Sequence, residues 1–258
     1  QEVMDGLEGV LNLATVGCID LGQASDFVTD GLTALGMSAN QSNDFVDMLS
    51  ATIVNSNTGV AQMQSAFENV APVCGTLGIS MSDLSVAIGL MSNQGVKAEK
   101  SGTALKNLLT NLASPTKKMT ECIQKYNLET AQQMIINGDL IGGIQEMKKQ
   151  LEGLTASEKT AVITTIAGKE ALSGVSALLN SSTSDINNLK FAVDSSTKSS
   201  RAYAQSLGLI DEEGNIVAGT FEKMIETQKG AYDQWVKFNE IMNECQDTMT
   251  YVGGTSTD

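Results

Sequence analysis

The stretch LGISMSD at residues 77–83 and the stretch LGMSANQ at residues 35–41 follow the same order of residue types. In each, Gly follows Leu and precedes an apolar residue, and a Ser then stands three residues before Asp83 or Gln41. A left-handed Gly followed by an apolar residue often ends a helix, and Ser with Gln or an acidic residue three positions later often begins one. Both stretches therefore predict a sharp turn between two helices.

On both sides of these turns, apolar residues recur at close to the 3.6-residue period of an α-helix. Thr155 and Glu158 repeat the capping-box spacing ahead of a further apolar run. These signals predict helices at residues 3–16, 21–35, 39–55, 59–77, 81–94, 98–113, 116–126, 139–153, 156–180 and 184–207. We therefore expect an all-α protein with a compact multi-helix bundle over residues 1–207.

The composition agrees with helical packing. Hydrophobic residues make up 41% of the 258 residues, aromatic residues only 4%, and there are only two Pro. Few aromatic residues favour packing between helices over an aromatic-rich sheet sandwich, and few Pro leave helices uninterrupted. A chain of this length fits one domain with an appendage, or two domains.

The second predicted domain, residues 208–258, holds a polar turn at 211–215 and then a seven-residue repeat over 221–252. The repeat predicts a long amphipathic helix, which either forms a coiled coil, with a trimer as the expected homo-oligomer, or folds back on its own domain. One of the two core positions of each heptad holds Phe221, Gln228, Trp235, Met242 and Met249, and the other holds Met224, Ala231, Phe238, Cys245 and Val252.

Charge is distributed unevenly along the chain. The net charge is −14, and the section before Lys97 contains ten acidic residues and no Lys or Arg. Binding to nucleic acid or to an anionic membrane surface depends on a basic surface, so neither partner is expected. No apolar run approaches the roughly 20 residues of a membrane span. The plainest role of the acidity is solubility, and in this section it also disfavours contact with DNA.

Motifs that carry enzyme chemistry are weak. The chain has no His, which removes the usual nucleophile pairs and zinc sites. Ser114 and Lys117 match a Ser-x-x-Lys spacing, but a helix stop followed by a cap, with Pro115 at the first helical position, explains them better. The polar turn at 211–215 lacks the spaced ligands of a calcium loop, and Gly168-Lys169 lacks the remaining residues of a phosphate-binding loop. No catalytic residue, cofactor or metal is predicted.

The four Cys show no metal-site or disulfide pattern. Cys18, Cys74, Cys122 and Cys245 lie 48 or more residues apart, without a Cys-x-x-Cys pair. We expect reduced thiols that pack as small hydrophobic residues. The chain begins Gln1-Glu2, directly ahead of an amphipathic pattern, which favours a segment cut from a longer protein over a secretory leader.

The middle of the chain contains a block of small residues followed by a leucine face. Gly102, Thr103 and Ala104 allow a neighbouring helix to approach closely, while Leu105, Leu108, Leu109 and Leu112 share one helix face. In order and spacing, the region from NVAPV at 69–73 through LGIS at 77–80 to SGTALK at 101–106 and LLTNLASP at 108–115 resembles the core of tailed-bacteriophage tail tape-measure proteins. The resemblance runs from about Leu13 to Ser182, and the positions that carry it include Gly95, Gly102, Thr103, Ala104, Leu105, Leu109, Pro115 and Gly168.

The resemblance implies a structural protein of the virion tail lumen, made in the bacterial host cytoplasm. Such a protein is wrapped by tail-assembly chaperones, fixes tail length inside the tail tube and leaves ahead of the genome. As one straight helix, 258 residues would span only about 390 Å. We therefore expect a folded station, meaning a compact section of a longer protein whose total length sets that of the tail. Two alternatives are a cell-wall hydrolase module of a tape-measure protein and a helical adaptor or effector domain.

Overall fold

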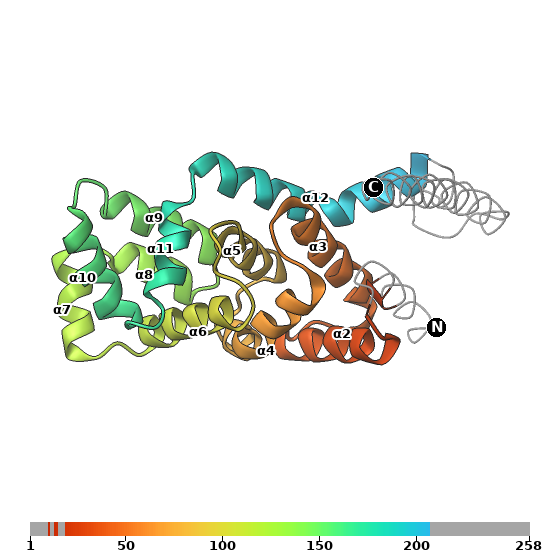
Figure 1. Ribbon diagram of the computed structural model, residues 1–258, viewed down its shortest axis with the longest axis horizontal. Coiled ribbons are helices and arrows are strands. Elements are labelled where there is room, and N and C mark those ends of the chain that lie inside the picture. The colour runs from red at the N-terminus through yellow and green to blue at the C-terminus, as the bar shows by residue number, and fades with distance from the viewer. Residues whose placement is uncertain (1–9, 11–12, 15–18, 207–258) are drawn as a thin grey trace, which may run out of the picture. The chain divides into compact units, whose positions relative to one another are not determined.

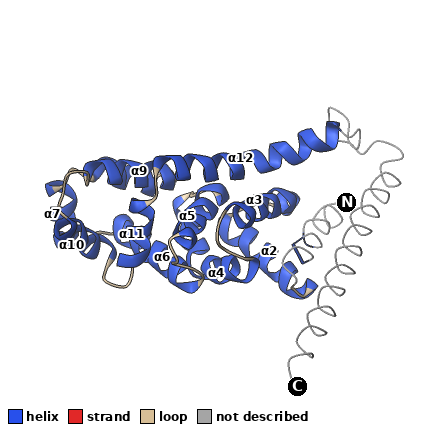
Figure 2. Cartoon of the chain, turned by 45° about the horizontal axis from the view of Figure 1, so that its top comes forward, coloured by secondary structure: helices blue, strands red, loops and turns tan. Residues whose placement is uncertain are grey.

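The computed structural model describes Val10, Leu13, Ala14 and residues 19–206, which form helices joined by short turns (Figure 1). The chain divides into two units, Gln1–Ser199 and Ser200–Asp258. All regular elements among the described residues are helical, eleven α-helices and one 3-10 helix (Figure 2). The all-α class is therefore confirmed. The predicted boundary at residues 207–208 stays a prediction, and the heptad segment 221–252 lies outside the described residues.

Most predicted helices begin and end within three residues of those observed. In chain order the elements are α2 (Leu21–Leu35), η1 (Ala39–Gln41), α3 (Ser42–Asn55), α4 (Val60–Leu77), α5 (Met81–Asn93), α6 (Glu99–Ala113), α7 (Lys117–Lys125), α8 (Glu129–Ile136), α9 (Leu140–Gln150), α10 (Ala156–Ala167), α11 (Leu172–Asn180) and α12 (Thr183–Ser206).

Two helix predictions were wrong. The single helix expected at 156–180 is divided into α10 and α11 at Gly168, whose φ of 88° and ψ of 164° belong to a region that only Gly adopts readily. Helix α8 was not predicted at all. It has eight residues and buries only Ala131 and Ile135 within its length, which is too short a pattern to show the helical period.

The two turns quoted first have the predicted geometry at their helix stops. Gly36 and Gly78 both have φ of 68°. After them, the Met37 amide donates to the Leu32 carbonyl at 2.8 Å, and the Ile79 amide donates to the Cys74 carbonyl at 2.9 Å. These are the contacts of a Schellman stop.

The helix starts of the two turns differ. Ser38 and Gln41 form both halves of a capping box. Ser80 accepts from the Asp83 amide at 3.1 Å, but the Asp83 carboxylate bonds to Ile141 and Lys190 instead. The second start is thus half a capping box, because the acidic side chain is used elsewhere in the fold.

Helix α5 lies at the centre of the described unit (Figure 1). Every residue from Met81 to Ser92 is buried, and helices α3, α4, α6, α9 and α11 pack against it. Gly89 makes one of these approaches possible, since a Cβ there would lie 2.9 Å from Leu189 of α12 and 3.0 Å from Thr52 of α3. A helix surrounded in this way presents an apolar or small residue on every side.

Three aromatic rings join the first helices of the unit. Phe27 of α2, Phe45 of α3 and Phe67 of α4 contact one another edge to face, with ring centroids 5.6–5.8 Å apart. Edge-to-face contacts add to the hydrophobic gain of burying the rings. The cluster therefore ties α2 and α3 to α4.

Helix α4 crosses its two main neighbours at backbone contact. A Cβ on Gly102 of α6 would lie 2.3 Å from the Ala66 carbonyl oxygen of α4. A Cβ on Gly75 of α4 would lie 2.0 Å from the Ala34 carbonyl oxygen of α2. Both distances are too short for any side chain, so these two glycines set how closely the helices approach.

We predict that Gly102→Ala destabilises the protein by about 1–3 kcal/mol, because the added methyl group forces α4 and α6 apart. The measurement is urea unfolding followed by circular dichroism. Gly59→Ala is the control for the added methyl group alone, since nothing lies within 4 Å of a Cβ at Gly59, the N-cap residue of α4. Alanine is a better helix former than glycine by about 1 kcal/mol, so a Gly102→Ala variant that gains stability would show that the crossing is not tight.

Candidate functional site

The residues that carry the family resemblance lie in helix α6 and in turns. Leu105 and Leu109 are fully buried, Thr103 is half-buried, and Ala104 packs against Gly174 of α11, where an added Cβ would lie 2.4 Å from the Ala104 Cβ. Together with the Gly102 crossing, these positions make α6 a packing helix that contacts α4, α5, α8, α10 and α11. Their role as a family motif stays a prediction.

The other three predicted positions shape the chain between helices. Gly95 has φ of 84° and follows α5, and Gly168 ends α10. Pro115 was expected at the first position of a helix, which is wrong, because α7 is capped by Thr116 and begins at Lys117.

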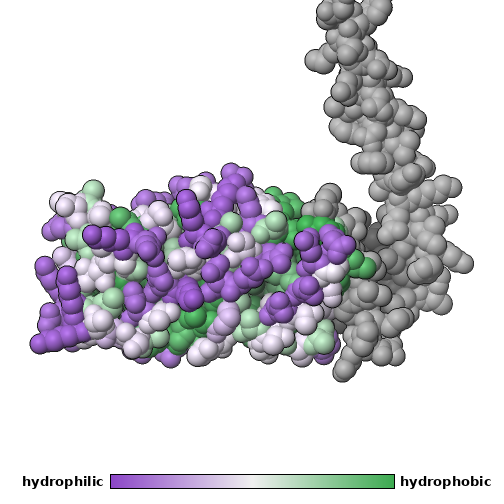
Figure 3. Space-filling model, turned by 60° about the horizontal axis from the view of Figure 1, so that its bottom comes forward, coloured by the Kyte–Doolittle hydropathy of each residue, from purple (hydrophilic) through white to green (hydrophobic). Residues whose placement is uncertain are grey.

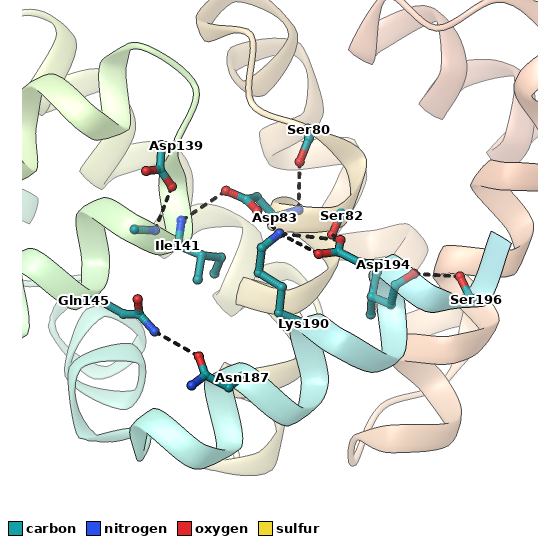
Figure 4. A network of polar contacts seen from close by, with 12 residues as sticks. Ser80, Ser82, Asp83, Asp139, Ile141, Gln145, Asn187, Lys190, Asp194 and Ser196 are labelled. Carbon is teal, nitrogen blue, oxygen red and sulfur yellow. Dashed lines mark hydrogen bonds and ion pairs between the residues drawn. The ribbon is translucent and has the colours of Figure 1, made fainter. Parts of the chain in front are cut away.

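A network of polar side chains connects α5, α9 and α12 (Figure 4). Lys190 of α12 forms an ion pair with Asp83 of α5 at 2.8 Å and a second with Asp194, one turn further along α12, at 3.3 Å. The Ser82 hydroxyl donates to the Asp194 carboxylate. Asp83 and Lys190 are 107 residues apart in sequence, so the network joins distant parts of the chain.

Carboxylates of the network and of Asp139 accept hydrogen bonds from the first amides of α9. The Asp139 side chain accepts from the Gly142 amide at 2.8 Å, and the second Asp83 carboxylate oxygen accepts from the Ile141 amide at 3.1 Å. The first amides of a helix have no partner within the helix and carry partial positive charge. Two carboxylates, one local and one from α5, therefore satisfy two of these amides.

Lys190 stays charged within this network. Its partial burial alone lowers its pKa, but the hydrogen bonds and negative charges of Asp83 and Asp194 outweigh that effect and raise the pKa above the ordinary value. A protonated Lys cannot remove a proton from the nearby Ser82 hydroxyl. The Ser, Lys and Asp side chains thus act as a clamp between helices and not as an activated nucleophile.

Hydrophobic contacts complete the docking of α12. Ile186, Leu189 and Val193 lie on one face of α12 and are buried, whereas Phe191 on another face is 74% exposed. Two further hydrogen bonds hold α12 and the C-cap residue of α11 to α9, from Gln145 to Asn187 at 3.5 Å and from Lys148 to the Ser181 carbonyl at 2.5 Å.

Other candidate chemistry gains no support in the described part of the chain. Among those residues, no group of three or more Cys, Asp or Glu is placed to hold a metal ion. Cys74 and Cys122 are free thiols, as expected, and burial raises the pKa of Cys74 to about 12 and also raises that of Cys122. Cys18 and Cys245 lie outside the described residues. No described helix is both long and apolar enough to cross a membrane.

In the part of the chain that the structure describes, the buried charge network joins helices α5, α9 and α12. Residues 1–168 match the model of a family described as phage-related minor tail protein. The chain therefore belongs to this phage tail family. It is also 30% identical over 209 residues to the tape measure protein of Pneumococcus phage Dp-1. The resemblance to tail tape-measure proteins inferred from the sequence is confirmed.

The match to the curated relative covers 80% of this chain but only 18% of the relative. The chain thus spans less than a fifth of the length of the tape measure protein that it matches. No solved structure matches the chain significantly.

We predict that Lys190→Met lowers the free energy of unfolding by about 1–3 kcal/mol, because it leaves Asp83 buried without its counter-charge. The range lies below that of a fully buried pair, since the Lys190 side chain is 35% exposed. Lys149→Met is the control. Its pair with Glu146 at 3.5 Å is at the surface, with a Lys149 side chain 71% exposed, and should contribute less than about 0.5 kcal/mol. Equal losses in the two variants would contradict the clamp.

The clamp has a defined pH dependence. Because the pKa of Lys190 is raised in the folded state, its stabilisation is complete below the ordinary value of 10.5 and is lost as pH rises through the folded pKa. As pH rises from about 10.5 through the raised folded pKa, the parent should therefore lose more stability than Lys190→Met.

Proposed function

We propose that the chain is a folded section of a phage tail tape-measure protein that acts in tail assembly, and that the whole protein fixes tail length and takes part in genome ejection. The observation that carries the proposal is the match to a tape measure protein over 80% of this chain, together with family membership. The role of the section itself is structural and not catalytic, in keeping with the absence of His and the fully paired Lys190.

The fold favours a compact folded section over an extended helical segment that adds length to the protein. Residues 19–206 would span about 280 Å as one straight helix at roughly 1.5 Å per residue. Instead, α5 is covered by five other helices and α12 returns to it through Lys190. This part of the chain therefore adds little length for its number of residues, and its contribution to the tail lies in its folded surface.

The proposed location is the tail lumen, with synthesis in the cytoplasm of the bacterial host. Tail-tube proteins and tail-assembly chaperones are the proposed partners, and DNA is not. The lack of any Lys or Arg before Lys97 supports this, because the first 96 residues repel a polyanion in the same channel. A cell-wall hydrolase module and a helical adaptor remain the alternatives, and release of fragments from purified peptidoglycan would identify the first.

The test is a pair of changes in a phage whose tape measure contains this section. In-frame deletion of residues 19–206 and the substitution Leu109→Asp should both block tail assembly or ejection. Leu109 is fully buried, so a carboxylate there unfolds the unit without changing the number of residues. A defect caused by Leu109→Asp would therefore come from loss of the fold and not from a shorter chain. Normal particles with this substitution, or tails shortened in proportion to the deletion, would contradict a folded station. Electron microscopy of the particles and plaque counts give the result.

We also propose that the heptad segment assembles the chain into trimers. The apolar core positions over 221–252 support a coiled coil, and the segment lies outside the described residues. Sedimentation equilibrium of the full chain should give a trimer, and the double variant Trp235→Asp, Phe238→Asp should give a monomer. A parent that sediments as a monomer at high concentration would contradict the proposal.

A further inference from the structure

A groove with a volume of about 320 Å³ opens between α2 and α4. Phe27 and Phe67, whose rings belong to the aromatic cluster, form part of its lining, together with Ala71 and Pro72 of α4. Figure 3 shows apolar patches between hydrophilic side chains on this side of the molecule. The volume is at the lower end of the range of about 300–1,000 Å³ for ligand pockets, so the groove fits a few apolar side chains.

Carboxylates border this apolar lining. Asp30 of α2 and Glu68 of α4 are both exposed and both line the groove. Within the described residues, neither takes part in an ion pair. The Gln64 amide donates to the Glu68 carboxylate at 3.2 Å, and the carboxylate can accept further hydrogen bonds.

The backbone of α4 adds an acceptor at the same place. Pro72 lies inside α4 and has no amide hydrogen, so it cannot donate to the Glu68 carbonyl four residues earlier. The groove therefore offers negative charge and hydrogen-bond acceptors around an apolar lining. No Lys or Arg occurs in the first 96 residues to balance them. The complementary ligand is apolar on one side and carries cationic donors beside it.

We propose that this groove docks one amphipathic helix of a partner protein, with Lys or Arg residues beside its apolar face. Large aliphatic side chains at i and i+3 or i+4 would contact the accessible lining residues Ala34 and Pro72, above a floor formed by the nearly buried Phe27 and Phe67. The flanking cations would meet Asp30 and Glu68. A helix is the occupant because the groove lies between two helices, whose surfaces accept the ridge of a third. The inference rests on the groove and its charges and is independent of the proposed role in the tail.

The test uses the full chain and a fluorescein-labelled 18-residue helical peptide of Leu and Lys, with binding followed by fluorescence anisotropy. The Lys peptide should bind, and a peptide with Glu in place of every Lys should not. Asp30→Asn with Glu68→Gln should weaken binding roughly 3- to 30-fold, as expected for two exposed charge pairs. Thr33→Trp, at an exposed position that lines the groove, should block the peptide without changing any charge.

The matched control is Asp26→Asn with Asp44→Asn. It removes the same charge from exposed residues that do not line the groove, and it should leave the affinity unchanged. Equal weakening by the two double variants would show general attraction to an acidic surface and would overturn the proposal. So would undiminished binding to Thr33→Trp, or salt-dependent self-association of the chain that accounts for the anisotropy change. Circular dichroism of each variant confirms that it is folded.

Discussion

The described fold depends on one constraint, which is that α5 is buried on every side. A helix without a solvent face must meet its neighbours with small or apolar residues, and at Gly89 side chains of both α3 and α12 lie too close to leave room for a Cβ. A charged residue in such a helix must also have a partner, because water cannot reach it. The one acidic residue of α5, Asp83, receives the Ile141 amide and the Lys190 ammonium group, so the same burial that excludes water also positions α9 and α12.

The sequence predicts this arrangement to the extent that it is specified locally. The stops at Gly36 and Gly78 and the capping boxes at Ser38 and Thr155 each depend on residues a few positions apart, and they appear as expected. Asp83 was expected to act within its own helix start. Its carboxylate goes instead to groups 58 and 107 residues away, and no local pattern encodes that choice. Gly168 is a possible helix stop, but apolar residues recur at the helical period on both sides of it, so a single helix was expected there.

The candidate site was less predictable than the fold. The small residues at 102–104 indicated close helix packing, and Gly102 lies against the α4 backbone as that pattern suggests. The groove between α2 and α4 could not be inferred, because it depends on the crossing at Gly75, the position of the aromatic cluster and the exposure of Asp30 and Glu68 together. Only the charge imbalance before Lys97 hinted at a cationic partner. The role that we propose for this section in a tape measure rests on its folded surface and not on its length.

The central claim is that α5 is the core around which the other helices are arranged. Amide hydrogen exchange of the full chain, read by mass spectrometry, tests it directly, because amides that open only on global unfolding exchange most slowly. The slowest exchange should occur in peptides covering Met81–Asn93, and Lys190→Met should accelerate exchange at the start of α9 and in α12 before it does so in α5. Exchange of α5 as fast as that of α7, which buries only Ile123, would contradict the account.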